Sequence, residues 1–125
     1  MAFGKAEEKL HRENVSEFDR KELKEISDNA LHDELIEAAR LAPSATNNQP
    51  WYFTARENDI HIYQQDPNFL KKLFYQKMNG IDMGIVMAHL WLAAEHHTGK
   101  ADFYQNEAAE KLEPEGYSYL ISLKI

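Results

Sequence analysis

Residues 42–51 carry the densest set of compact polar groups in the chain, in the order Ala-Pro-Ser-Ala-Thr-Asn-Asn-Gln-Pro-Trp. The segment offers hydroxyl groups, side-chain amides and backbone N–H groups, and it has no large apolar side chain before Trp51. Such neutral donors and acceptors suit the recognition of a polar, planar ligand. The structural alternative is a proline that ends a helix, followed by Asx turns that close a loop. The polar side chains are those of Ser44, Thr46, Asn47, Asn48 and Gln49.

The elements on either side must position this segment. Residues 31–41 have helical spacing, and their apolar stripe continues to the start of the polar segment. Residues 51–55 and 60–63 are apolar and β-branched runs around a turn-rich linker, a pattern that predicts a β-hairpin. The polar segment is therefore expected where a helix meets a sheet. The stripe consists of Leu31, Leu35, Ala38, Ala39 and Ala42.

The remaining elements follow from capping and breaking residues. Asp19 is placed to cap a short helix over 20–26. Asp66 opens a second helical segment, whose apolar side is formed by Phe69, Leu70, Leu73 and Phe74. A long apolar helix is expected to begin at Gly80 and to end at Gly99 as its C′ residue. Residues 104–112 predict a short amphipathic turn, and 117–125 alternate like a strand.

Composition excludes several classes of partner. The chain has 14 Lys and Arg against 21 Asp and Glu, a net charge of −7. Nucleic acids and anionic membranes require clustered cations, so neither is expected as a partner. The basic residues between Lys5 and Lys24 alternate with Glu, which favours a solvated helical face over a phosphate site. The chain has no cysteine, no secretory signal pattern and no apolar run of the roughly 20 residues that span a bilayer, which together fit the cytoplasm.

Other catalytic or metal-binding patterns are weak. The chain lacks G-x-G-x-x-G and G-x-S-x-G, so Ser44 has no nucleophile elbow. His89, His96 and His97 have spacings that do not bring three rings to one metal ion, and solvated or helix-capping histidines are the favoured interpretation. Asp82 is interpreted as a residue near a helix N-terminus rather than a catalytic acid. No catalytic side chain and no metal site are therefore predicted.

The order of the polar residues resembles the flavin-binding segment of the nitroreductase family, approximately A-x-x-A-P-S-x-x-N-x-Q-P-W. Residues 39–51 supply every fixed position of that pattern in register. A second block over 80–99, with Asp82 and a Leu-Trp-Leu-Ala-Ala run, is similar to the family's long central helix, and 117–125 is similar to its closing strand. The matches cover roughly residues 32–125, and the closest likeness is to the Thermotoga-type branch.

The resemblance implies a fold, a cofactor and a set of contacts. The implied fold is α/β (α+β), a mainly antiparallel sheet flanked by helices, with a long central helix. The implied cofactor is FMN, which passes hydride from NAD(P)H to a nitroaromatic or quinone-like acceptor. Pro43, Ser44 and Ala45 would line one face of the isoalloxazine, Asn47 would donate a hydrogen bond to the ring or ribityl region, and Gln49 with Trp51 would fix the exit of the loop.

The chain length is short for this family. Members of the family open with an arginine-rich segment that grips the flavin phosphate, and no R-R-S-x-R segment stands in this chain. The first residues are instead similar to the end of a mid-chain strand. We therefore interpret 1–125 as a single domain resembling the C-terminal half of a nitroreductase, with a charged linker and short helix over 1–28 and the core over 29–125.

Two classes of function remain open at this point. One is an FMN-dependent oxidoreductase, or half of one, in which FMN binding by this chain alone is weak or absent unless Arg40 or Lys100 replaces the missing arginines. The other is a non-catalytic module that keeps the fold and binds no flavin by itself. Residues 83–94 are apolar on more faces than a surface helix of a monomer needs. A homodimer or a complementary N-terminal half is therefore the expected partner.

Overall fold

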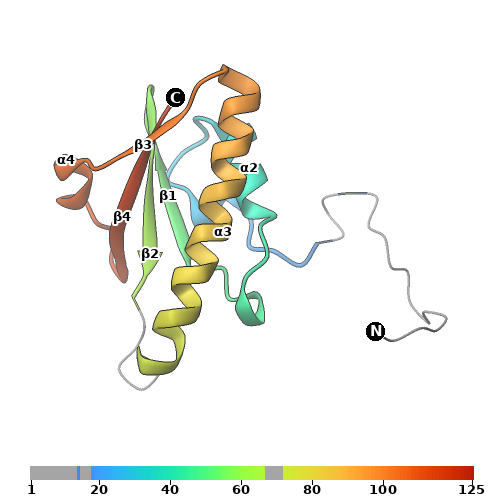
Figure 1. The fold of residues 1–125 in the computed structure, drawn as a ribbon, viewed down its shortest axis with the longest axis vertical. Coiled ribbons are helices and arrows are strands. Elements are labelled where there is room, and N and C mark those ends of the chain that lie inside the picture. The colour runs from blue at the N-terminus through green and yellow to red at the C-terminus, as the bar shows by residue number, and fades with distance from the viewer. Residues whose placement is uncertain (1–13, 15–17, 67–71) are drawn as a thin grey trace.

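The computed structural model describes residues 14, 18–66 and 72–125, and for 72–78 the backbone only. Four strands form one antiparallel sheet in the order β1-β2-β4-β3 (Figure 1). The strands and helices are α1 (Leu23–Ile26), α2 (Asp33–Arg40), the 3-10 turn η2 (Ala45–Asn47), β1 (Trp51–Ala55), β2 (Asp59–Gln65), α3 (Lys72–Thr98), β3 (Asp102–Tyr104), α4 (Glu107–Glu110) and β4 (Tyr117–Lys124).

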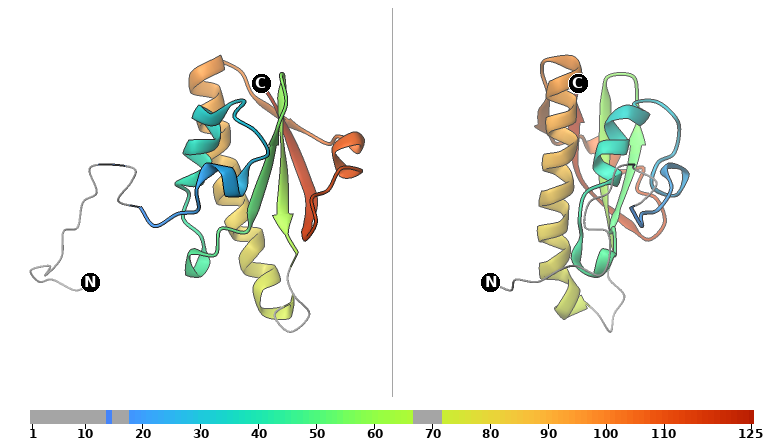
Figure 2. Two further views of the ribbon diagram at one scale, coloured as in Figure 1. Left: turned by 180° about the vertical axis from the view of Figure 1, so that it is seen from behind. Right: turned by 90° about the vertical axis from the view of Figure 1, so that its right-hand side faces the viewer.

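The sheet has helices on both sides. Helices α2 and α3 lie against one face, and the short helix α4 lies on the other side, as Figure 1 and the left view of Figure 2 show. The polar segment runs from α2 through η2 to β1, beside the half of α3 that comes first in the chain (Figure 1). The expected α/β fold with an antiparallel sheet and a long helix is confirmed.

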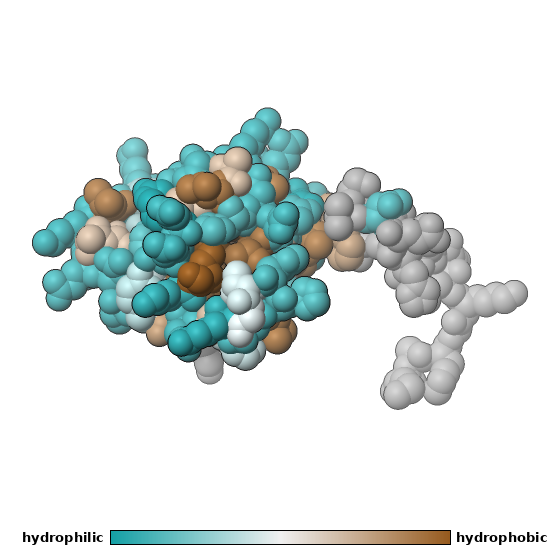
Figure 3. All heavy atoms as spheres, turned by 90° about the horizontal axis from the view of Figure 1, so that it is seen from above, coloured by the Kyte–Doolittle hydropathy of each residue, from teal (hydrophilic) through white to brown (hydrophobic). Residues whose placement is uncertain are grey.

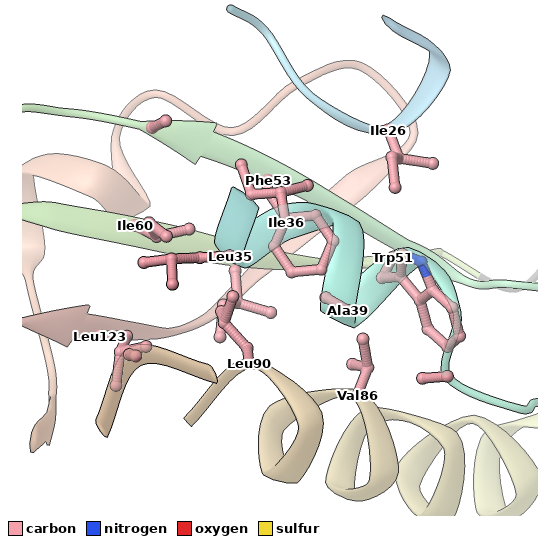
Figure 4. Packing of buried hydrophobic residues seen from close by; sticks show 14 of the residues in the cluster. Ile26, Leu35, Ile36, Ala39, Trp51, Phe53, Ile60, Val86, Leu90 and Leu123 are labelled. Atoms are coloured by element: carbon pink, nitrogen blue, oxygen red, sulfur yellow. The ribbon is translucent and has the colours of Figure 1, made fainter. Parts of the chain in front are cut away.

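The apolar core fills the space between the sheet and the two helices. Phe53 and Ile60 project from the sheet toward Ile36 of α2, while Val86 and Leu90 project from α3 toward α2 (Figure 4). The core follows the strand periodicity, because every second residue of β1 and β2 faces the helices. Its fully buried large side chains include Trp51, Phe53, Ile26, Ile36, Ile60, Ile62, Leu90 and Leu123.

The predicted hairpin and closing strand are confirmed. Residues Trp51–Ala55 pair antiparallel with β2, with Phe53 opposite Ile62. The last strand, Tyr117–Lys124, pairs with β2 on its other side and has a register shift between Ile62 and Tyr63. The Arg56 N–H donates to the Asp59 carbonyl at 2.8 Å and closes the hairpin turn. The alternation of apolar and polar residues was enough to predict these strands, because each strand has one apolar face.

The predicted start of the central helix is wrong. Gly80 lies inside α3, which begins at Lys72, so the two helical segments expected on either side of it are one helix. An interior glycine costs about 1 kcal/mol relative to alanine, a penalty that packing of a long helix can offset. The expected opening at Asp66 continues into residues 67–71, outside the described part. Gly99 has φ 80°, and its N–H donates to the Glu95 carbonyl at 2.9 Å, so the predicted C-terminus is confirmed.

Three smaller expectations also need correction. The first helix covers only Leu23–Ile26, with Glu22 rather than Asp19 as its N-cap. Leu31 is not on the buried stripe but is 51% exposed, because α2 begins only after His32, which has φ 58°. The strand Asp102–Tyr104 was not predicted, because 3 residues are too few to show an alternating pattern.

The core reaches into the part of the chain that the sequence analysis assigned to a linker and short helix. Ile26 is buried in it, and Ser27 forms a parallel bridge with Phe53 at the edge of β1. The Asp28 N–H donates to the Phe53 carbonyl at 3.2 Å and extends that contact. The predicted charged linker before Asn14 lies outside the described residues. No helix of the described residues is long and apolar enough to cross a membrane.

Candidate functional site

The polar segment folds into a tight turn with unusual backbone angles. Ser44 is extended, and the next residues form the 3-10 turn Ala45–Asn47. Thr46, Asn47 and Gln49 have φ angles of 51°, 55° and 51°. The left-handed region is uncommon for residues other than glycine, and a β-branched threonine there is an outlier. Such conformations persist only where surrounding contacts hold them, and they cluster at ligand-binding sites.

Contacts within the turn hold part of this conformation. The Gln49 N–H donates to Ser44 Oγ at 2.9 Å, and the Gln49 side-chain amide donates to the Asn47 carbonyl at 3.0 Å. The Asn47 N–H donates to the Ser44 carbonyl at 3.0 Å. The Ser44 hydroxyl acts as an acceptor here, and its O–H has no acceptor among the described residues. Ser44 and Asn47 are both half-buried rather than enclosed, so a ligand can reach them.

The segment before α1 holds the turn from outside. The Asn47 side-chain amide donates to the Asp19 carbonyl at 2.7 Å. The Lys21 N–H donates to Gln49 Oε1 at 2.8 Å, and Lys21 Nζ donates to the Gln49 carbonyl at 3.3 Å. Two of the amides that the sequence predicted as ligand contacts are therefore already bonded within the protein.

The six predicted cofactor residues divide into two groups. Pro43 is exposed, and Ser44, Ala45 and Asn47 are half-buried on the turn. Gln49 is buried, and Trp51 is 0% exposed within the core. The expectation that Gln49 offers an accessible amide is therefore wrong, because its amide joins the turn to Lys21. Both residues occupy positions that fix the exit of the turn into β1.

Two cations beside the turn were missed by the sequence analysis. Arg20 and Lys21 were assigned to a solvated helical face, but neither lies in α1, and both are half-buried. The Arg20 guanidinium donates to the Leu41 carbonyl at 3.5 Å and to the Asp19 carbonyl at 3.0 Å. Alternation with acidic residues suggested exposure, whereas long-range hydrogen bonds to Leu41 and Gln49 decide the positions of Arg20 and Lys21. Lys24 does behave as expected and forms an exposed pair with Glu22.

Arg40 and Lys100, which were expected to replace the missing arginines, are less suitable for binding a phosphate at the turn. Arg40 forms a bidentate ion pair with Glu37, with Nε–Oε2 at 2.6 Å and Nη2–Oε1 at 2.7 Å. This side-chain hydrogen bond to Glu37 raises the pKa of Arg40. Lys100 follows the far end of α3. Thr98 lies about 24 Å along the helix axis from Asp82, at 1.5 Å per residue, so Lys100 is remote from the turn.

Asp82 was expected near a helix N-terminus, and this is wrong because α3 begins at Lys72. Its side chain is buried and accepts the Ala45 N–H at 2.9 Å. The histidines do not gather at the turn. His96 and His97 are exposed, with ring centroids 5.3 Å apart. Among the described residues, no group of three or more His, Cys, Asp or Glu side chains could hold a metal ion.

A second polar cluster lies on the sheet face away from α2 and α3. His61 Nδ1 and Ser122 Oγ are 2.7 Å apart, and Ser122 Oγ is also 2.7 Å from the Tyr119 hydroxyl. Burial lowers the pKa of His61, and nearby Asp59 partly opposes that shift. The Tyr104 hydroxyl donates to Asp59. Ser122 is fully buried, so the contact between its hydroxyl and the histidine stabilises the fold and offers no accessible nucleophile.

Comparisons with known proteins show the family through a family model and the fold through a solved structure. The family model described as "Putative TM nitroreductase" matches residues 1–94. A solved structure, that of a "putative nitroreductase" from Thermotoga maritima MSB8, is similar with a TM-score of 0.59 at 19% sequence identity. That alignment covers 86% of this chain and 42% of the other, so the chain spans less than half the length of that protein. No curated protein matches the chain.

Proposed function

Because this chain belongs to the TM nitroreductase family, we propose that the turn Ala45–Asn47 binds FMN as part of an oxidoreductase. The observation that supports this most directly is the accessible polar turn with Arg20 and Lys21 beside it. Bound FMN would supply a two-electron carrier between NAD(P)H and a nitroaromatic or quinone-like acceptor. The protein's own task is to hold and orient that group.

The residues of the turn suit a flavin by their chemistry. Pro43 and Ala45 offer small apolar surfaces for a planar ring, and the Ser44 hydroxyl can donate to a polar edge. Asn47 Nδ2 bonds to Asp19, but an amide nitrogen has two donors, which leaves one for the ligand. The Lys21 ammonium carries three donors and makes one bond, to the Gln49 carbonyl, which leaves two donors for the ligand.

We propose that Arg20 and Lys21 supply the positive charge for the flavin phosphate. Charge-assisted hydrogen bonds contribute roughly 1.5–3 kcal/mol each, and each 1.4 kcal/mol changes affinity about tenfold. The chain's net charge of −7 disfavours a dianionic ligand unless such local cations offset it. FMN binding by this chain alone is accordingly expected to be measurable but weaker than in a complete two-subunit site.

A titration with two flavins tests this assignment. FMN and riboflavin share the isoalloxazine but differ in the phosphate, so the wild-type chain should quench FMN fluorescence at lower concentration. Arg20→Ala and Lys21→Ala should each weaken FMN binding about 10- to 100-fold, because each removes one charge-assisted contact, and leave riboflavin binding nearly unchanged. Lys24→Ala is the matched control, since Lys24 is exposed and paired with Glu22.

Three results would contradict parts of the proposal. Equal affinity for FMN and riboflavin would remove the phosphate role of Arg20 and Lys21. Binding of neither flavin would favour the alternative, a non-catalytic module. That alternative has one supporting observation: Gln49 and Asn47 are already bonded to the segment 19–21, so the turn keeps its shape without a ligand. FMN binding without NAD(P)H oxidation in the presence of a nitroaromatic would contradict the oxidoreductase role while leaving the flavin site in place.

We also propose that α3 joins this chain to a second nitroreductase-like half, either another copy or a complementary N-terminal chain. Its buried face packs on the core, yet Ile81 and Leu92 on other faces are 61% and 60% exposed. Ile85 and Ala88 lie between them at spacings of three and four residues, which makes a second apolar stripe. Seen from above, the end of the molecule is mostly hydrophilic, with a small hydrophobic group at its centre (Figure 3). A helix with two apolar faces is suited to an interface.

Sedimentation of paired variants tests the interface. Ile81→Glu with Leu92→Glu should convert an associated species to monomer without unfolding it, because both side chains are exposed in this chain. Leu112→Glu is the control, since Leu112 is equally exposed, at 66%, but follows α4 on the other side of the sheet. A wild-type chain that stays monomeric at micromolar concentration, with and without an N-terminal half, would overturn the proposal.

A further inference from the structure

Asp82 occupies an unusual position for a carboxylate. It lies in the middle of α3 and is only 3% exposed. Its Oδ1 accepts the backbone N–H of Ala45 at 2.9 Å. Its Oδ2 is buried and has no hydrogen-bond partner among the described residues. Burying a carboxylate with one unsatisfied oxygen lowers the stability of the fold. We therefore look for the role of Asp82 in the hydrogen bond that its other oxygen makes.

The bonded oxygen holds the turn at its first residue. Ala45 begins the 3-10 turn, and the next residues, Thr46 and Asn47, have positive φ. The other contacts that fix the turn from outside come from the segment 19–21 and reach Asn47 and Gln49. Among the described residues, the Asp82 side chain alone makes a hydrogen bond from α3 to this turn. The turn is thus held at its beginning by the long helix and at its end by the segment before α1.

We propose that Asp82 is a positioning residue that holds the turn Ala45–Asn47 in its strained, ligand-ready conformation. The carboxylate acts through the Ala45 backbone rather than by touching a ligand. Its link to flavin affinity rests on the proposed function, but its effect on the turn does not. Strained backbone is retained only where neighbouring groups over-determine it, and Asp82 provides the constraint from the helix side.

Three substitutions separate positioning from bulk stability. Asp82→Asn keeps a side-chain oxygen that can accept the Ala45 N–H. Asp82→Leu removes the acceptor and adds apolar volume, and Asp82→Ala removes the acceptor and leaves space. Because a buried carboxylate is itself costly, removing its charge offsets part of the lost hydrogen bond, and Asp82→Leu is expected to fold even if the alanine variant does not.

Amide hydrogen exchange followed by NMR is the decisive measurement. In Asp82→Leu the amides of residues 45–49 should exchange about tenfold faster or more, because the turn opens locally, while the amides of β1 and β2 keep their rates. Asp82→Asn should restore the rates to within about threefold. Glu95→Ala is the matched control: Glu95 Oε1 accepts the Ala101 N–H at 3.1 Å at the other end of α3, so only residues near Ala101 should respond.

Flavin titration of the same variants gives the second readout. Asp82→Leu should weaken FMN binding at least tenfold, whereas Asp82→Asn and Glu95→Ala should stay within about threefold of the wild type. Unchanged exchange at residues 45–49 in Asp82→Leu would overturn the inference, as would faster exchange spread evenly over the chain. If no variant and no wild type binds FMN, the proposed function fails, while the exchange data still decide the role of Asp82.

Discussion

The two faces of the sheet have interiors of different chemistry, although they share the same strands. On the face toward α2 and α3, Phe53, Ile62 and Ile121 stand side by side across β1, β2 and β4. One residue along, Thr54, His61, Ser122 and Tyr104 form the corresponding row on the opposite face. The first row is held by packing, whereas His61, Ser122 and Tyr104 of the second row make side-chain hydrogen bonds. The same backbone register therefore supports two sources of stability, and they should respond differently to substitution and to pH.

The largest effect is expected on the apolar face. Phe53→Ala removes a fully buried ring from the space that Ile36 also fills, and should lower the free energy of unfolding by about 3–5 kcal/mol. Urea denaturation followed by circular dichroism measures it. Tyr52→Ala, a half-buried neighbour on the other face, is the control and should cost less. Equal losses for the two variants would show that the faces do not differ in packing.

The next effect concerns the hydrogen-bonded face. Ser122→Ala leaves His61 Nδ1 and the Tyr119 hydroxyl without their shared partner in a buried site, and should destabilise by about 1–3 kcal/mol. Thermal denaturation checks the loss. Ser118→Ala is the matched control in the same strand, because Ser118 is exposed. A stable Ser122→Ala variant would mean that the polar row contributes little.

A smaller effect should come from the contact between the sheet and α4. The Tyr63 hydroxyl donates to the Ala109 carbonyl at 2.9 Å, and both residues are buried. Tyr63→Phe deletes the donor and keeps the ring, so the loss should be about 0.5–1.5 kcal/mol. Hydrogen exchange should show faster opening at residues 107–110 with no change in α2. A change that reached α2 would contradict the independence of the two faces.

The smallest effect is a pH dependence confined to the polar face. Burial lowers the folded-state pKa of His61 below its unfolded value near 6.5. The unfolded chain therefore binds the proton more readily, so stability should fall as the pH drops below about 6.5 and level off below the folded pKa. His61→Gln removes this titration and should flatten that part of the melting-temperature profile. Identical profiles for the two proteins would show that His61 does not set the slope.

The sequence predicted the strands and the end of α3 well and the side-chain contacts of the polar face poorly. The hairpin, the closing strand and the end of α3 at Gly99 each carry a local signal, either alternation or a glycine with positive φ. The row that contains His61 and Ser122 carries no such signal, because its residues are polar, differ in type and meet only through strand pairing. The candidate turn was predicted in part: the sequence identified its residues, but not their hydrogen-bond partners.

Features that depend on neighbouring residues and contacts that depend on the folded chain thus have different origins. The sequence alone determined the family, the strand alternation and the position of the polar turn, because these depend on residues close together in the chain. Tertiary structure decided which groups of the turn remain accessible. It buried Gln49 and Trp51, brought Arg20 and Lys21 from a charged stretch to the turn, and placed the carboxylate of Asp82 against Ala45. The physical reason is that a buried polar group needs a hydrogen-bond partner, and that partner can come from any distance along the chain.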